Sequence, residues 1–267
     1  MSSMYSCRLA TMTLTTREVS YDTGTIMIHH WPGDTEWADF MAERIEVDLP
    51  TMSKLVGIPF PDKELEIIET ISPELYGYGG WYDTSSSLIE VTEDLDQQLA
   101  LHEISHGWFN DDLFTDRFIT EGLAEEYAAR TIAESGGDLP DPDKPAPVLT
   151  DADKLNNWTG ASLGDQAAEE YGYGASWWVM RLLTDEIGVD SLSLVLQAAA
   201  ANETAYVGDD EPESVDPTDD WKRFLDLLEE VGGSARRDCD LRRVGRYSKR
   251  VANARRTGRD TIAVSRP

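Results

Sequence analysis

The chain has 267 residues, 40% of them hydrophobic, and a formal net charge of −28. This length suffices for one sizeable core or for two lobes around a cleft, and the apolar content excludes a disordered chain. No apolar run reaches the length of about 18 residues that a membrane helix needs, and so acidic a body repels nucleic acid and anionic membranes.

The charge is unevenly distributed along the chain. Residues 236–267 hold eleven Arg or Lys against three Asp, a net of +8, which leaves −36 on the residues before them. We therefore expect a basic, loosely ordered tail over residues 234–267, after an acidic body. Docking of the tail on the acidic body and binding of the tail to nucleic acid remain alternatives. Only six residues are Lys, and a Lys-poor acidic surface favours adaptation to high salt over an ordinary acidic enzyme.

The ends of the chain carry few further signals. Cys7 and Cys239 have neither the spacing of metal ligands nor that of a disulfide framework. Residues 1–16 lack the continuous apolar core of a secretory signal, so we expect a cytoplasmic protein.

The first elements in chain order are strands and a helix. Residues 18–30 and 64–71 have the composition of strands, and residues 36–56 carry apolar side chains at helical spacing. Pro50 is expected to kink or interrupt that helix, because proline lacks the N–H that the helix needs.

A Gly- and Tyr-rich loop is predicted over residues 72–83, followed by a short alternating strand over residues 87–92. Such a strand, if it lies at the edge of the sheet, can pair with an extended peptide. A plain edge strand is the alternative.

Helices dominate the rest of the chain. Helical periodicity is found around residues 99–109 and over residues 118–135, 163–187, 190–202 and 221–231, with an acidic loop over residues 208–219. Strands followed by helices indicate an α+β fold. We predict a small N-terminal mixed sheet with helices packed on it, an active-site helix, and a helical C-terminal lobe.

The most informative stretch is L-A-L-H-E-I-S-H-G-W-F at residues 99–109, which contains two of the four His in the chain. His102 and His106 are four residues apart, so a helix places both imidazoles on one face, in line with Leu95 and Leu99. Glu103 points about 100° around the helix from His102. The motif H-E-x-x-H thus supplies two nitrogen ligands for one zinc ion and a carboxylate that can take a proton from water.

A catalytic zinc takes a third protein ligand, and no further His lies downstream. The candidate is Glu121, fifteen residues after His106 on the next predicted helix. Glu125 lies one turn further on the same face. It can orient a ligand histidine, or it can be a solvated surface residue.

H-E-I-S-H-G-W-F followed by F-I-T-E-G-L-A-E-E-Y resembles the gluzincin metallopeptidases, in particular aminopeptidase N-related enzymes and their shorter bacterial relatives. The resemblance implies a zincin-like fold over residues 18–233, with His102, His106 and Glu121 as zinc ligands and Glu103 as general base. The interval between His106 and Glu121 is four residues shorter than in the aminopeptidases.

Family members also have a tyrosine that donates a hydrogen bond to the oxyanion, within a Y-x-K-G segment of a later helix. The segment Tyr171-Gly-Tyr-Gly is similar. By this resemblance Tyr171 is the expected oxyanion partner and Tyr173 the second choice. Packing aromatics are the alternative for both.

The resemblance fails at one position. Exopeptidases of the family carry a G-x-M-E-N strand whose Glu holds the free amine of the substrate, and the corresponding position here is Thr84, with Asp83 adjacent. We therefore expect a zinc metallopeptidase that cleaves a peptide or protein substrate but lacks the signature of an aminopeptidase. The alternative is a catalytically degenerate zinc-binding scaffold for a peptide or protein partner. The sequence does not indicate an oligomeric state.

Overall fold

The computed structural model of the protein describes residues 13–22, 24–61, 64–145, 155, 158, 166–205 and 221–233. These residues form a five-stranded mixed sheet and several helices, so the predicted α+β class is confirmed. Cys7, Cys239, the acidic loop at 208–219 and the basic tail at 234–267 lie outside the described residues.

The elements occur in the following order. They are β1 (Thr15–Tyr21), β2 (Gly24–His30), α1 (Thr35–Glu43), η1 (Arg44–Asp48), α2 (Leu49–Val56), β3 (Glu64–Glu69), η2 (Glu74–Tyr76), β4 (Gly80–Asp83), β5 (Leu88–Val91), α3 (Gln97–Ser105), α4 (Arg117–Glu134), α5 (Gln166–Ile187), α6 (Val189–Ala200), α7 (Trp221–Leu227) and η5 (Leu228–Gly232).

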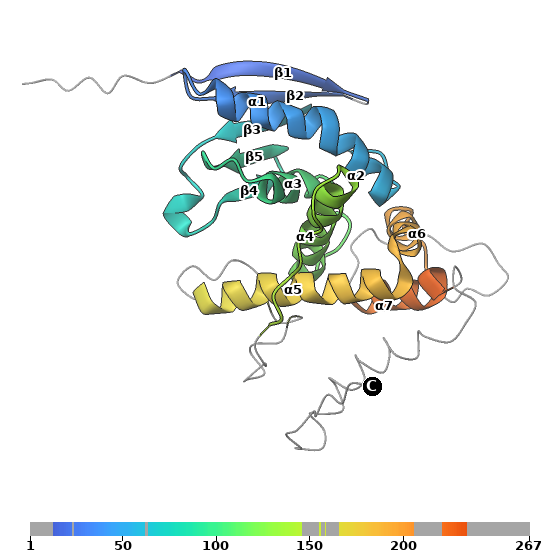
Figure 1. Cartoon of the computed structure of the whole chain (residues 1–267). Coiled ribbons are helices and arrows are strands. Elements are labelled where there is room, and N and C mark those ends of the chain that lie inside the picture. The colour runs from blue at the N-terminus through green and yellow to red at the C-terminus, as the bar shows by residue number, and fades with distance from the viewer. Residues whose placement is uncertain are drawn as a thin grey trace, which may run out of the picture.

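The sheet has the strand order β1-β2-β3-β5-β4. Its three central strands are parallel, and both outer strands are antiparallel to their neighbours. Alternate residues such as Ile26, Ile28 and Ile67 are fully buried, because successive side chains of a strand point to opposite faces. This buried face packs against the helices, with α1 along β1 and β2 and α3 beside β4 (Figure 1).

Two strand predictions require correction. Residues 72–83 do not form only a loop, because β4 lies at their end and pairs with β5 across a four-residue turn. This pairing makes β4 the edge strand and places β5 inside the sheet, so the prediction of an edge strand at 87–92 is wrong. The turn is closed by Asp83, which accepts hydrogen bonds from Ser85 and Ser86. The four-residue spacing concealed the hairpin, since the familiar hairpin signals mark shorter turns.

The single strand predicted over residues 18–30 is also wrong. Two strands, β1 and β2, form an antiparallel hairpin in which Tyr21 pairs with Gly24. The first strand begins earlier than predicted, at Thr15.

The helix that follows β2 is interrupted near Pro50, as predicted. A wider helical turn, η1, separates α1 from α2, and the Leu49 N–H bonds to the carbonyl of Arg44, five residues back. Pro50 then occupies the first turn of α2, a position where its missing N–H is tolerated.

Helices α3 and α4 lie in the middle of the molecule, between the sheet and the long helix α5 (Figure 1). Helix α3 begins after Asp96, whose carboxylate accepts hydrogen bonds from the backbone N–H groups of Gln98 and Leu99. Leu95 therefore precedes the helix and is exposed, contrary to its predicted place on the buried stripe. No helix among the described residues is long and apolar enough to cross a membrane.

Candidate metal centre

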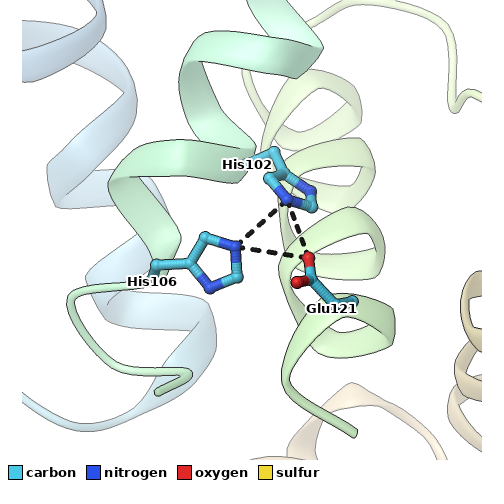
Figure 2. Close-up of side chains that lie close together, drawn as sticks. All are labelled: His102, His106 and Glu121. Atoms are coloured by element: carbon cyan, nitrogen blue, oxygen red, sulfur yellow. Dashed lines mark hydrogen bonds and ion pairs between the residues drawn. The ribbon is translucent and has the colours of Figure 1, made fainter. Parts of the chain in front are cut away.

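The two histidines of the motif lie at the end of α3. His102 occupies the last turn and His106 is the C-cap residue, so both side chains point toward α4 (Figure 2). Their Nε2 atoms are 3.1 Å apart. This geometry confirms the prediction that the H-E-x-x-H spacing places both imidazoles on one side of a helix.

Glu121 in the second turn of α4 completes the cluster. Its Oε2 atom is 3.3 Å from Nε2 of His102 and 3.4 Å from Nε2 of His106 (Figure 2). This oxygen is buried and has no hydrogen-bond partner. Among the described residues, these three form the cluster that could hold a metal ion.

The charges of the cluster are mutually stabilising. Burial by itself would raise the pKa of Glu121, but the two nearby histidines outweigh burial and lower it. Burial likewise opposes the charged form of His102, yet Glu125 and Glu121 raise its pKa well above the ordinary value.

The outer nitrogen of each histidine faces an acceptor. Nδ1 of His106 donates to the carbonyl of Phe109 at 2.8 Å, so in the neutral imidazole the lone pair is on Nε2. Nδ1 of His102 lies 3.4 Å from Oε1 of Glu125, and Gln98 donates to the other oxygen of Glu125 at 2.7 Å. The sequence left two alternatives for Glu125, and the structure places it beside His102 and not at a solvated surface position.

Glu103 is 4% exposed and lines the cleft in front of the histidines. Burial raises the pKa of its carboxyl, and the positive charge of His102 and His106 opposes the rise. The backbone of Gly80 in β4 lies against it, because a Cβ added at Gly80 would meet Cγ and Oε1 of Glu103 at 2.8 Å. The carboxylate is therefore held between α3 and the edge strand.

The cleft has a volume of about 500 Å³, a size typical of ligand sites. One wall is the edge strand with Tyr82, whose ring stacks on His106 at a centroid distance of 6.4 Å. The segment between α3 and α4 supplies Asn110, Asp111 and Thr115.

The two candidate tyrosines are placed differently. Tyr173 lines the cleft, with its ring 6.3 Å from that of His102, whereas Tyr171 is not among the lining residues. Residues two apart on a helix point about 200° from one another, so only one of the two can face the site. Burial, reinforced by Glu121, raises the pKa of Tyr173 and keeps its hydroxyl protonated.

Thr84 lines the cleft. It occupies the position at which the gluzincin exopeptidases have the glutamate that binds the amine of the substrate. The neighbouring Asp83 uses both carboxylate oxygens on Ser85 and Ser86 in the turn. These hydrogen bonds lower its pKa, and Asp83 is not a cleft residue.

Sequence reasoning missed a group of residues behind the cluster. Arg117 bonds to Glu121, to Glu169 and to Tyr173, and Tyr78 donates to Glu169. The sequence contained two indications of this group. Arg117 precedes Glu121 by four residues, and Glu169 precedes Tyr173 by four residues, so each pair lies on one face of a helix.

A comparison of the chain with protein-family models and with curated protein sequences finds no match. The function of the protein is therefore inferred from the residues of the site.

Proposed function

We propose that this protein is a zinc-dependent metallopeptidase of the gluzincin type. The observation that carries the proposal is the spacing of three ligand atoms, Nε2 of His102, Nε2 of His106 and Oε2 of Glu121, at 3.1–3.4 Å from one another. Atoms bound at about 2.0–2.2 Å in a tetrahedral zinc site are about 3.3–3.5 Å apart. Two imidazoles and one carboxylate are also a donor set that catalytic zinc takes.

The unpartnered oxygen of Glu121 supports the same proposal. A buried carboxylate oxygen without a hydrogen bond is costly, and Oε2 faces two histidine nitrogens. A cation between these three atoms satisfies all of them at once. The backbone carbonyl of Phe109 and the carboxylate of Glu125 lie beside the outer nitrogens of the two histidines. Ligand histidines in metal sites typically have a carbonyl or a carboxylate at this position.

Zinc bound there would polarise a substrate carbonyl and acidify a water molecule. Glu103, whose pKa is raised by burial, accepts the proton of the attacking water at its carboxylate and returns it to the leaving amine. Tyr173 donates its hydroxyl hydrogen to the carbonyl oxygen as negative charge develops there. The burial of Glu103 limits access of bulk water to that proton.

The shape of the cleft favours an extended peptide as substrate. The strand β4 is the outermost strand of the described sheet on this side, and it forms one wall of the cleft. An extended peptide can pair with such an edge. Thr84 in place of an acid, together with the engagement of Asp83 in its own turn, favours cleavage that does not depend on a free N-terminal amine.

The test uses the full chain loaded with zinc and an unfolded protein as substrate. We expect cleavage that a chelator abolishes and added zinc restores. Glu103→Gln should bind zinc but lose hydrolysis, whereas Glu121→Ala should lose zinc. Glu134→Gln is the matched control, because Glu134 is an exposed glutamate at the other end of α4.

The outcomes separate the peptidase from a zinc-binding scaffold. A zinc-loaded protein that cleaves no peptide at low or at multi-molar salt would support the scaffold. Wild-type hydrolysis by Glu103→Gln would overturn the mechanism.

A further inference from the structure

Arg117, the first residue of α4, contacts both Glu121 and Tyr173. We infer that Arg117 is a positioning residue that aims Oε2 of Glu121 at the two histidines and fixes the hydroxyl of Tyr173 beside them. The consequence for hydrolysis rests on the proposed function, whereas the consequence for metal affinity rests on the three-ligand cluster alone.

The contact with Glu121 is selective for one oxygen. Nε of Arg117 donates to Oε1 of Glu121 at 3.3 Å, and the other oxygen, Oε2, is the atom that faces His102 and His106. A carboxylate that is free to rotate can present either oxygen or both. With Oε1 occupied by the guanidinium, Glu121 presents Oε2 as a single ligand atom in a fixed direction.

The contact with Tyr173 determines the direction of its hydroxyl hydrogen. Nη2 of Arg117 donates to the phenol oxygen at 3.0 Å. A guanidinium only donates, so the phenol oxygen is the acceptor and its own hydrogen remains available to another acceptor. Because Tyr173 lines the cleft beside His102, that hydrogen can be donated to a bound carbonyl.

Arg117 is itself firmly held. Its Nη1 and Nη2 atoms donate to the two oxygens of Glu169 at 3.1 and 2.9 Å. The guanidinium carbon lies 4.0 Å from the ring centroid of Trp158, and Trp158 and Tyr78 both donate to Glu169. A planar fork held on one edge by a carboxylate and on one face by an indole has little freedom, so its remaining donors point in fixed directions.

The competing explanation is that Arg117 only neutralises Glu169. Glu169 is 8% exposed, and removal of its cationic partner leaves a buried negative charge beside the cluster. A single substitution of Arg117 therefore mixes two effects. The double variant Arg117→Met/Glu169→Gln separates them, because it removes both charges together and still leaves Glu121 and Tyr173 without their donor.

The experiment measures four proteins: wild type, Arg117→Lys, the double variant, and Arg130→Met as matched control. Arg130 lies on the same helix and pairs with Glu126 at the same four-residue spacing, outside the cleft. Zinc affinity is measured by competition with a chromogenic chelator, the ligand geometry by the visible absorption of the Co²⁺-substituted protein, and hydrolysis as kcat and KM separately.

We expect the double variant to fold, to bind zinc about 10–100-fold more weakly, and to have a changed Co²⁺ spectrum. Its kcat should fall while KM stays close to that of the wild type, because Tyr173 acts on charge that develops during the reaction. Arg117→Lys should not restore these properties, since one ammonium cannot reach the three acceptors in the same geometry. Arg130→Met should keep the wild-type zinc affinity and spectrum.

Wild-type zinc affinity, Co²⁺ spectrum and kcat in the double variant would overturn the inference and leave the proposed function intact. If the double variant binds zinc more weakly but the wild type cleaves no peptide, the positioning of Glu121 is supported and the proposed peptidase function is overturned. A wild type that binds no zinc would overturn both.

Discussion

Gly122 of α4 lies directly against the backbone of Ser176 in α5. A Cβ added at Gly122 would fall 2.7 Å from the carbonyl oxygen of Ser176 and 2.8 Å from Cγ of Met180. The glycine that follows Glu121 therefore allows α5 to approach α4 closely. This approach brings Tyr173, one turn before Ser176, to the cluster of His102, His106 and Glu121.

We expect Gly122→Ala to destabilise the protein by about 1–3 kcal/mol, because the added methyl meets backbone that cannot move without shifting a helix. The matched control is Gly174→Ala, where a Cβ would meet no atom within 4 Å. That substitution should be neutral or stabilise by about 0.4–1 kcal/mol, since alanine favours a helix. Urea unfolding measures both variants. Equal stability of the two would contradict the close packing of α4 on α5.

Gly80→Ala should impair the proposed reaction without removing the metal. Its Cβ would meet the Glu103 side chain at 2.8–2.9 Å, and a displacement of about 1 Å at a catalytic group can cost about 10²-fold in rate. We expect a lower kcat at unchanged zinc affinity. Gly79→Ala is the comparison, because its Cβ would meet Leu99 and not Glu103. If Gly79→Ala lowered kcat as much, the effect would come from the strand as a whole.

Glu125→Gln should weaken zinc binding by about 10–100-fold while the protein stays folded. The glutamine keeps the size of the side chain but removes the negative charge beside Nδ1 of His102. Competition with a chelator measures the affinity, with Glu134→Gln as the exposed control on the same helix. An unchanged zinc affinity would show that the 3.4 Å contact between Glu125 and His102 does not contribute to zinc binding.

The cluster of His102, His106 and Glu121 could be predicted because local rules determine most of it. Helical spacing brings the two histidines together. A catalytic zinc takes a third protein ligand, and a carboxylate on the following helix can supply it. The choice between Tyr171 and Tyr173 could not be made in this way. It depends on which face of α5 packs on α4, and this packing is set by contacts between residues far apart in the chain.

The sheet was predicted less well than the helices. Its five strands have four to seven residues each, so each carries little periodicity. The edge strand β4 was hidden in a Gly- and Tyr-rich segment, where Gly79 and Gly80 are required by contacts with Leu99 and Glu103 and not by a turn. Only the packing of α3 against β4 reveals that requirement.

Glu126 lies at the centre of a buried network that the sequence did not indicate. It is fully buried and accepts hydrogen bonds from Arg130, Arg181 and Trp177. Removing one member of a buried charge network leaves the others uncompensated. This network joins α4 to α5 through residues that do not line the cleft.

We expect Glu126→Gln to destabilise the protein by about 3–5 kcal/mol, because two guanidinium groups lose their shared carboxylate. Asp185→Asn removes a carboxylate that pairs with the same Arg130 but has a side chain 59% exposed, so its cost should stay below about 1 kcal/mol. Chemical unfolding with a chelator present measures both. Similar costs for the two variants would contradict a buried network.

Glu69, at the end of β3, is also a buried carboxyl. It is 1% exposed, and one oxygen accepts the Trp31 N–H at 2.7 Å while the other has no hydrogen-bond partner. Burial raises its pKa, and so does the nearby carboxyl of Asp34, whereas the Trp31 N–H and the charge of His30 act in the opposite direction.

A carboxyl whose pKa is higher in the folded than in the unfolded state binds its proton more tightly when folded. The stability that Glu69 contributes is therefore complete below the unfolded pKa, near 4.5, and is lost as the pH rises through the raised folded value. Glu69→Gln keeps an acceptor for Trp31 and cannot ionise. We expect this variant to be the more stable protein at neutral pH, by about 1–3 kcal/mol, with the difference shrinking as the pH falls toward 4.5. Urea unfolding of both proteins across this range, with a chelator present, measures the difference, and a pH-independent difference would show that Glu69 does not titrate on unfolding.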